Sequence, residues 1–361
     1  MSTRYGASKA EYEAWLQANG HPRYRADQVW DALYHQRRPL ETATNLPTAL
    51  RDEIAREFPL ALTTIAERHG DRGTTRKFLF GTRDSAQIET VLMVSPNRAT
   101  VCVSSQAGCA MGCTFCATGQ AGFERQLDAG EIVEQILLAG HGVDEPITNV
   151  VFMGMGEPLA NYDATWAAVE RIHTDLGISA RRITVSTVGV VPGIRRLARE
   201  SIPVTLAVSL HAADDRLRNT MIPLNRRYPL TELIDAAHEY ARARGRRVTF
   251  EYACIDGVND QPEHAERLAE LLRPLGPLGA HVNLIPLNQT HDFAGRAPAM
   301  VRIRDFAEQL TDLGLNATVR RNRGTDIDAA CGQLRERIGT PTPLGPLRAG
   351  PGPESSTRMS E

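Results

Sequence analysis

Residues 108–119 read GCAMGCTFCATG and place three cysteines, Cys109, Cys113 and Cys116, on one short stretch flanked by glycines. Thiolates are the usual protein ligands of a [4Fe–4S] cluster, which has four irons. Three local cysteines would leave one iron open to bind a substrate. Two alternatives are three unrelated thiols and a zinc site, which prefers paired C-x2-C units and four protein ligands. The C-x3-C-x2-C spacing favours the cluster.

Strands and helices alternate along the chain from about residue 98 to 325. This alternation predicts a mostly parallel sheet with right-handed crossovers. With about six β/α units, we expect an α/β fold that forms a partial (β/α)6 barrel of TIM type, with its chemistry at the carboxyl ends of the strands. The expected strands are 100–104, 149–153, 182–186, 204–210, 248–252, 281–285 and 317–320, and the expected helices are 131–139, 162–174, 193–200, 230–244, 263–272 and 301–313.

The cysteine spacing resembles that of the radical S-adenosylmethionine (SAM) enzymes, in which SAM binds the open iron through its amino and carboxylate groups. A carboxylate is then expected beside the SAM amine. Residues 154–158, GMGEP, follow a predicted strand. Glycines such as Gly156 let the backbone approach a ligand closely, and Glu157 is suited to accept hydrogen bonds from the ammonium group. A plain turn at the end of the strand is the alternative.

Short polar residues also end the next strands of the predicted barrel. Ser186 ends one strand, Ser209-Leu210-His211 ends the following one, and Asn288 follows the strand 281–285. Each could bind ribose hydroxyls or the methionine carboxylate of SAM. Taken singly, such residues more often cap a helix or a turn. His211 could also act as a base, although a satisfied structural histidine is an equal alternative.

The bulk composition is that of an ordinary globular protein. Of the 361 residues, 42% are hydrophobic and 23% are charged, which allows one large domain and a smaller one. No apolar run approaches the roughly 20 residues of a membrane span, and residues 1–15 lack the apolar core of a signal peptide. We therefore expect a cytoplasmic protein without membrane contact. Six cysteines in such a protein indicate metal or redox chemistry rather than structural disulfides.

The positive charge of the chain is almost entirely arginine. There are 39 arginines but only two lysines, Lys9 and Lys77, and the net charge is −2. A GC-rich genome explains much of this bias. Arginine also suits phosphate binding and base stacking better than lysine does, so the Arg–Arg pairs along the chain are weak candidates for RNA contacts.

The two ends of the chain differ from the barrel in pattern. Residues 1 to about 85 look mainly helical, with apolar residues at helical spacing in 26–35 and 47–58. Residues 76–93 alternate like a strand and predict a small β ribbon. The last stretch is rich in Pro, Gly and Ser, which is typical of a disordered tail. We therefore divide the chain into a small N-terminal helical accessory domain with a β-ribbon linker (1–90), a core (95–325), a C-terminal segment (326–338) and a tail (339–361).

Three further cysteines lie outside the cluster spacing. Cys254, in the strand VTFEYAC, is interpreted as a small buried hydrophobic residue. Cys102 precedes the cysteine loop, and Cys331 lies in DIDAACGQL after the last predicted strand. Because a thiolate is a good nucleophile, we interpret Cys102 and Cys331 as a working pair of thiols.

Five motifs of the chain occur together in one family of radical SAM enzymes. They are CxxxCxxC (109–116), GMGEPL (154–159), SLHA (209–212), RRNRGTDIDAACGQL (320–334) and Ile88-Glu89-Thr90. By these motifs, the chain from about residue 20 to 337 resembles the RlmN/Cfr family of radical SAM RNA methyltransferases. The DIDAACGQL segment is the most specific part, since ordinary radical SAM enzymes lack it. The family usually has proline where this chain has Gln289.

The resemblance implies a reaction that uses two SAM molecules per turnover. The first methylates Cys331, and the second is cleaved reductively to a 5′-deoxyadenosyl radical that takes hydrogen from the new methyl group. The methylene radical adds to an electron-poor carbon of adenine, Cys102 forms a transient disulfide with Cys331, and Glu89 accepts the ring proton. A radical route is needed because that carbon is electrophilic and cannot attack SAM. Thiol–disulfide exchange supplies the leaving step.

The resemblance also implies ligands and partners. The partners would be 23S rRNA, at an adenosine of the peptidyl-transferase centre, tRNA, at adenosine 37 of the anticodon loop, and an electron donor such as flavodoxin or ferredoxin. The N-terminal helical module would then bind RNA, with a plain packing module as the alternative. The implied cluster ligands are Cys109, Cys113 and Cys116, and the implied SAM contacts are Gly156, Glu157, Ser186, Ser209, Leu210, His211 and Asn288.

Two other functions remain open at this point. Methylation of carbon 8 of the same adenine, as in Cfr-like enzymes, would use the same residues, although the run 320–328 is closer to the carbon-2 branch. A non-catalytic iron–sulfur protein that binds RNA or carries electrons would keep the three loop cysteines but would not need Cys331.

Overall fold

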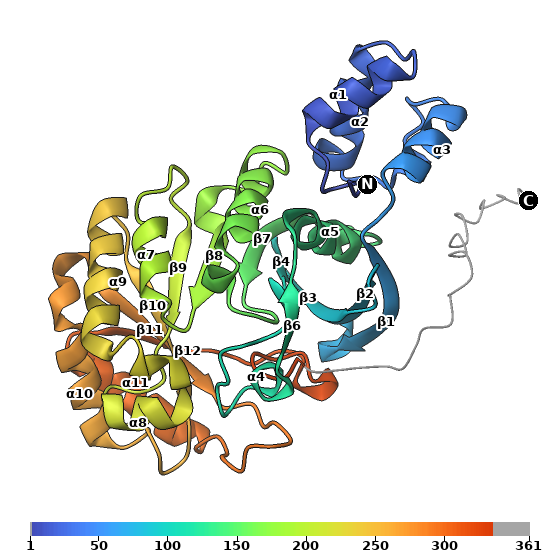
Figure 1. The fold of residues 1–361 in the computed structure, drawn as a ribbon. Helices are drawn as coiled ribbons and strands as arrows, with labels where there is room; N and C mark the ends of the chain where they lie inside the picture. Colours follow the sequence, from blue (N-terminus) through green and yellow to red (C-terminus); the bar gives the residue numbers. More distant parts are fainter. Residues whose placement is uncertain (1, 335–361) are drawn as a thin grey trace, which may run out of the picture.

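The computed structural model describes residues 2–334, except for the side chains of residues 277 and 278. Figure 1 shows a curved sheet wrapped by helices, with a separate group of N-terminal helices standing at one end of it. The predicted tail, 339–361, and the last part of the predicted C-terminal segment, 335–338, lie outside the described residues.

One ten-stranded sheet forms the centre of the molecule. Its first four strands are antiparallel: β1 (Leu62–Gly70), β2 (Thr75–Thr82), β3 (Gln87–Ser95) and β4 (Arg98–Cys102). From β4 onward, each strand is parallel to its neighbour: β7 (Ile147–Phe152), β8 (Ile183–Thr187), β9 (Thr205–Ser209), β10 (Val248–Cys254), β11 (Ala280–Pro286) and β12 (Asn316–Val319). Within residues 2–334 the sheet begins at β1 and ends at β12, so the barrel is open.

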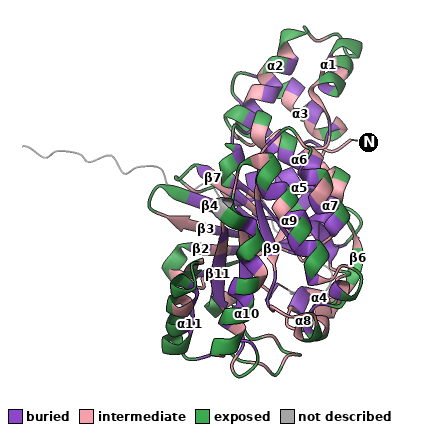
Figure 2. Ribbon diagram, turned by 90° about the vertical axis from the view of Figure 1, so that its left-hand side faces the viewer, coloured by how far each residue is buried: buried purple, intermediate pink, exposed green. Residues whose placement is uncertain are grey.

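Helices cover the outer face of the parallel strands, and Figure 2 shows that their buried sides face the sheet. The first of them, α5, begins with a capping box between Asp128 and Glu131, which satisfies two backbone N–H groups at its start. The expected partial barrel is confirmed, and each expected barrel strand overlaps an observed one. The helices between the strands are α5 (Ala129–Gly140), α6 (Tyr162–Thr174), α7 (Val191–Leu197), α8 (Asp215–Met221), α9 (Leu230–Arg244), α10 (Pro262–Leu272) and α11 (Met300–Asp312).

The N-terminal helices are α1 (Lys9–Ala18), α2 (Tyr24–Trp30) and α3 (Thr48–Glu57). Their shared core is aromatic: Tyr12 packs on Phe58 with ring centroids 4.3 Å apart and on the edge of Trp30 at 6.3 Å. Arg171 from α6 donates a hydrogen bond to the carbonyl of Gly6 (2.8 Å), which ties this module to the barrel. None of the described helices is long and apolar enough to cross a membrane.

The helical prediction for residues up to about 85 is wrong over residues 62–70, whereas the β ribbon predicted over residues 76–93 is observed as β2 and β3. Residues 62–70 form strand β1, which pairs with β2 along its length. Two backbone N–H groups at its start, those of Ala61 and Leu62, donate to the buried carboxylate of Glu134 on α5. The β-branched run Thr63-Thr64-Ile65 favours a strand. The β ribbon is thus continuous with the main sheet.

Candidate active site

A short hairpin holds the cysteine loop. Strands β5 (Gln106–Gly108) and β6 (Phe123–Gln126) pair on either side of it, and the N–H of Cys109 donates to the carbonyl of Gly122 (2.8 Å). Gly108 has φ +74°, and a Cβ there would lie 2.1 Å from the Gly122 carbonyl oxygen, so only glycine fits. Helix α4 (Ala117–Ala121) begins directly after Cys116.

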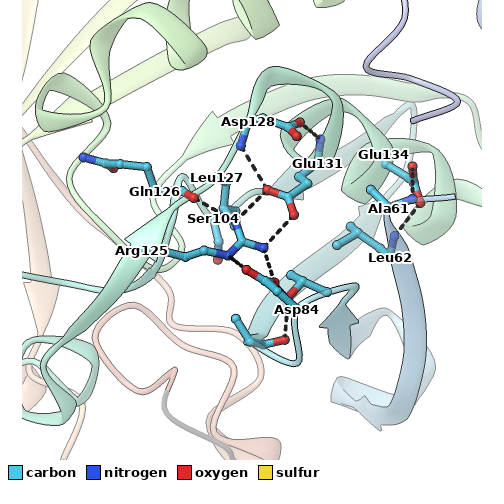
Figure 3. A network of polar contacts seen from close by, with 12 residues as sticks. Ala61, Leu62, Asp84, Ser104, Arg125, Gln126, Leu127, Asp128, Glu131 and Glu134 are labelled. Carbon is cyan, nitrogen blue, oxygen red and sulfur yellow. Dashed lines mark hydrogen bonds and ion pairs between the residues drawn. The ribbon is translucent and has the colours of Figure 1, made fainter. Parts of the chain in front are cut away.

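An ionic network anchors this hairpin to the rest of the barrel (Figure 3). Arg125 on β6 donates to both carboxylate oxygens of Glu131 at 2.7 and 2.9 Å, and to Asp84 at 2.8 Å. Asp84 lies in the turn between β2 and β3, and Glu131 lies in the first turn of α5. A bidentate arginine fixes geometry as well as charge. The cysteine loop therefore has a rigid base.

The three loop cysteines face one cavity at the carboxyl ends of the barrel strands. Burial raises the pKa of Cys109 to about 12 and raises the pKa of Cys113 and Cys116, so thiolates here need a bound cation. Among the described residues, no three His, Cys, Asp or Glu side chains are grouped to hold one metal ion. Three thiols that face one cavity fit the three protein ligands that a [4Fe–4S] cluster with an open iron would need.

Most of the predicted SAM contacts line this same cavity. Gly156, Glu157, Ser186, Ser209, His211 and Asn288 all contribute to its wall, together with Cys331. They come from the ends of β7, β8, β9 and β11, as a barrel site requires. Leu210 is the exception: it is fully buried and does not line the cavity. Its carbonyl instead accepts a hydrogen bond from the Arg218 side chain (3.0 Å).

Glu157 is a buried carboxylate held from two sides. Its Oε1 accepts from the N–H of Leu159 (3.0 Å) and its Oε2 from the N–H of Val188 (2.9 Å). Burial raises its pKa to about 7 in spite of these bonds. An ammonium group in the cavity would offset that burial, because an opposite charge favours the ionised carboxylate. Glu157 is thus suited to the amino group of SAM.

The glycines of the GMGEP motif are needed for packing against the protein itself, besides any approach of a ligand. A Cβ at Gly154 would lie 2.7 Å from the carbonyl oxygen of Val103, and one at Gly156 would lie 2.5 Å from the Cβ of Gln106. Gly156 also has φ +98°. Both glycines let the turn after β7 lie against the chain between β4 and β5. The turn therefore joins the cavity wall formed by Gly156 and Glu157 to the cysteine hairpin.

His211 is engaged by the backbone. Its Nδ1 accepts a hydrogen bond from the N–H of Ala253 (2.9 Å), so the neutral ring carries its proton on Nε2. Burial lowers its pKa to about 3. The ring also meets the edge of Phe115 at a centroid distance of 4.8 Å. These contacts support the structural alternative over a general base.

Arg218 on α8 is a site residue that the sequence reasoning missed. Its side chain is buried and donates to the carbonyls of Val188 (2.6 Å), Ser209 (3.0 Å) and Leu210 (3.0 Å). It also donates to Asn225 Oδ1 (2.6 Å). One guanidinium group thereby joins the chain beyond β8 to the end of β9. The only sequence signal was the pattern Asp214-x-x-Leu217, which caps the helix that carries it.

The C-terminal segment is tied to the cysteine loop and to β11. The N–H of Ala117 donates to the carbonyl of Gly332 (2.7 Å), and the Thr118 hydroxyl donates to that of Leu334 (2.6 Å). Asn288 donates to the Cys331 carbonyl (3.0 Å) and accepts from Asn322 (2.6 Å). The recorded bonds of Asn288 thus position the Cys331 segment, while the residue also faces the cavity.

Cys331 lies between two cavities. The second is lined by Cys102, which the first lacks, and the two cavities share Cys331, Arg320 and Glu251. The Arg320 side chain hydrogen-bonds to Cys331. Burial raises the pKa of Cys102 to about 12, and the nearby Cys331 adds to the effect. The structure therefore brings Cys102 and Cys331 together, and all six thiols are free. Cys254 is buried in β10, as expected.

Glu89 lies apart from both cavity walls. Its side chain on β3 is fully buried and forms an ion pair with Lys77 on β2, with Oε1 and Nζ 2.9 Å apart. The Glu89 N–H also points at the sulfur of Met155 in the GMGEP motif (3.3 Å). Glu89 thus lies on the strand next to that of Cys102, because Val91, two residues further along β3, pairs with that cysteine.

An open barrel in which a three-cysteine loop and polar strand-end side chains face one cavity is the arrangement of a radical SAM enzyme. Residues 103–276 match the model of the radical SAM superfamily. The chain is 48% identical over 352 residues to a probable dual-specificity RNA methyltransferase RlmN of Chloroflexus aurantiacus, covering 93% of each chain. It is 51% identical over 348 residues to the one of a Parafrankia species, covering 91% of this chain and 90% of the other. The chain belongs to the RlmN family of radical SAM RNA methyltransferases.

A solved structure agrees with this assignment. The crystal structure of a radical SAM methyltransferase from Sphaerobacter thermophilus superposes with a TM-score of 0.88. It is 51% identical in sequence, and the match covers 93% of this chain and 99% of that one. The enzyme accordingly uses a [4Fe–4S] cluster and SAM, and it needs a reductant.

Proposed function

We propose that this enzyme methylates carbon 2 of an adenosine in 23S rRNA and of adenosine 37 in tRNA. The observation that carries the proposal is the place of Cys331, between the cavity of the loop cysteines and the cavity of Cys102. A non-catalytic iron–sulfur protein has no use for a thiol in that position. The relatives named above are RlmN proteins, which favours carbon 2 over carbon 8.

Three cysteines, Cys109, Cys113 and Cys116, would hold the cluster, and Glu157 with the strand-end serines Ser186 and Ser209 would orient SAM. When bound, the cluster supplies the electron that cleaves SAM reductively. Before that, the Cys331 sulfur attacks the methyl group of a first SAM. The S–CH3 bond forms, the sulfonium–CH3 bond breaks, S-adenosylhomocysteine leaves and the thiol proton goes to solvent.

Cys331 then carries the carbon that joins adenine. Its methyl group loses a hydrogen atom, and the methylene group bonds to the ring. The adduct would return one electron to the oxidised cluster and lose the ring proton, which leaves a closed-shell thioether between the ring and Cys331. Attack of the Cys102 thiolate on the Cys331 sulfur then forms a disulfide and breaks the bond between that sulfur and the methylene carbon, which keeps the electron pair and takes a proton from solvent to become the methyl group. Glu89 is proposed as the acceptor of the ring proton. The target base has to leave its stack to reach Cys331.

The proposal extends to partners and place of action. RNA carries phosphate groups, and an arginine guanidinium group can bind a phosphate through two parallel hydrogen bonds. This chain has 39 arginines. The N-terminal helices are proposed to contact RNA, and flavodoxin or ferredoxin is proposed as the electron donor. Acting on ribosomal and transfer RNA places the enzyme in the cytoplasm.

An anaerobic assay tests the function. The holoenzyme is incubated with reductant, SAM labelled on its methyl group and a protein-free rRNA fragment, and nucleosides are analysed by mass spectrometry. We expect 2-methyladenosine, 5′-deoxyadenosine and S-adenosylhomocysteine. Cys331→Ala should abolish 2-methyladenosine while the cluster persists, and Cys254→Ala, at a buried cysteine outside the site, should retain activity. An 8-methyl product, or methylated RNA from Cys331→Ala, would refute the proposal.

A further inference from the structure

Lys77 forms a buried ion pair with Glu89 across strands β2 and β3. The side chain of Lys77 is 3% exposed and that of Glu89 is not exposed at all. Lys77 lies opposite Val91, two residues from Glu89, so the pair is a diagonal cross-strand contact on one face. Two buried charges cost desolvation that their attraction must offset, and a hydrophobic pair would fill the same space without that cost.

The composition of the chain makes this lysine conspicuous. It has 39 arginines and two lysines, and the other lysine, Lys9, is an exposed partner of Asp27 on the N-terminal module. Arginine thus supplies the positive charge at nearly every Lys or Arg position of this chain, but not at this one. An ammonium group is a compact point charge on a flexible stem, whereas a guanidinium group is a wider planar fork. The site therefore calls for a small, movable cation.

Lys77 also reaches the segment that presents Cys331. Its Nζ donates to the carbonyl of Asp328 (3.3 Å), three residues before Cys331. The same segment is held from β1 and its following turn, where the N–H of Asp71 donates to Asp326 (3.2 Å) and the N–H of Gly324 donates to Asp71 (2.8 Å). One ammonium group thus links the Glu89 carboxylate to the Cys331 segment.

We propose that Lys77 is a positioning residue for the proton-transfer step: its ion pair fixes the place of the Glu89 carboxylate and ties it to the Cys331 segment. This inference rests on the proposed function. In the step, the proton leaves the methylated ring carbon, the C–H electron pair stays in the ring, and the proton ends on a Glu89 oxygen. Lys77 makes and breaks no covalent bond.

The test compares Lys77→Met, Lys77→Arg, Glu89→Gln, the double variant Lys77→Met/Glu89→Gln, and the control Arg195→Met, at an exposed ion pair with Glu239 between α7 and α9. Three quantities are measured in each holoenzyme under single turnover: methyl-Cys331 by peptide mass spectrometry, 5′-deoxyadenosine, and RNA, free or crosslinked to enzyme on a denaturing gel. In Lys77→Met we expect methyl-Cys331 and 5′-deoxyadenosine to persist. Release of methylated RNA should fall about 100-fold, the scale of general base catalysis, with a crosslinked adduct accumulating.

Lys77→Arg should recover part of the release rate because it restores the charge, and Arg195→Met should match the unaltered enzyme. If Lys77→Met does not fold, the double variant decides, because its buried pair is neutral. It should be no slower than Glu89→Gln alone, since the two residues act as a unit. Normal release in Lys77→Met, or losses that multiply in the double variant, would overturn the inference. Absence of methyl-Cys331 in the unaltered enzyme would instead refute the proposed function itself.

Discussion

Replacing Arg218 by lysine should destabilise the cavity wall at the ends of β8 and β9 while keeping the positive charge. The guanidinium group makes four hydrogen bonds of 2.6–3.0 Å to three backbone carbonyls and Asn225. A lysine ammonium group sits at one point and cannot reach acceptors spread over two loops, so we expect it to keep two of the four. Each buried acceptor left without a partner costs about 1–3 kcal/mol. The variant should therefore lose about 2–6 kcal/mol of unfolding free energy.

The same change should weaken SAM binding, because Val188, Ser209 and Leu210 all belong to the strand ends that line or support the cavity. We expect a Kd at least about tenfold higher, which corresponds to about 1.4 kcal/mol. Urea denaturation followed by circular dichroism gives the stability, and equilibrium dialysis of the anaerobic holoenzyme gives the Kd. Arg195→Lys, at an exposed pair with Glu239, is the matched control. A variant with unchanged SAM affinity would refute the positioning role of Arg218.

Two further outcomes are expected from the geometry of single residues. Gly156→Ala should lower the unfolding free energy by more than about 2 kcal/mol, because the φ of Gly156 is +98° and the new Cβ would lie 2.5 Å from Gln106. The control Gly142→Ala, at φ +73° with open space around it, should lower the unfolding free energy by only about 1 kcal/mol. Equal losses of stability in thermal melts of the two variants would contradict the packing argument. Burial raises the pKa of Glu134 from 4.5 to about 7, so its protonated form favours the fold. Its stabilisation is full below about pH 4.5 and is lost as the pH rises through 7, by up to about 3 kcal/mol. Denaturation at pH 5 and pH 8 should show a smaller decline in Glu134→Gln than in the unaltered enzyme, and an equal decline would assign the pH dependence to other groups.

The parallel strands of the barrel could be predicted because each is a short apolar run between helical patterns. For buried strands such as β9 and β10, the predicted ranges agree with the observed ones to within two residues at either end. Strand β1 could not be predicted in this way, since most of its residues are partly or fully exposed and its pairing with β2 decides its conformation. The hairpin β5–β6 has strands of three and four residues, too short to show a period.

The candidate site divides in a similar way. The loop cysteines and the strand-end residues were predictable because their spacing and their place after strands carry chemical meaning. Leu210 was the weakest of these, since its side chain is buried away from the cavity. Arg218 and Lys77 could not be recognised from local pattern, because their roles come from carbonyls and a carboxylate supplied by other elements. For Lys77 the sequence held a usable signal, the rarity of lysine among 39 arginines.

The cysteine loop and the Cys331 segment are far apart in sequence, but hydrogen bonds to backbone carbonyls hold them together. Ala117 and Thr118, which directly follow Cys116, bind the carbonyls of Gly332 and Leu334. Any change that orders residues 109–118, such as binding of the cluster, must therefore also restrict the segment that carries Cys331. Lys77 and Asp71 restrict the other end of that segment from the β ribbon. The cysteine loop and the ribbon β1–β3 thus hold the Cys331 segment from its two ends. This explains why the barrel sheet is extended by β1–β3, since an enzyme that only cleaves SAM has no such segment to position.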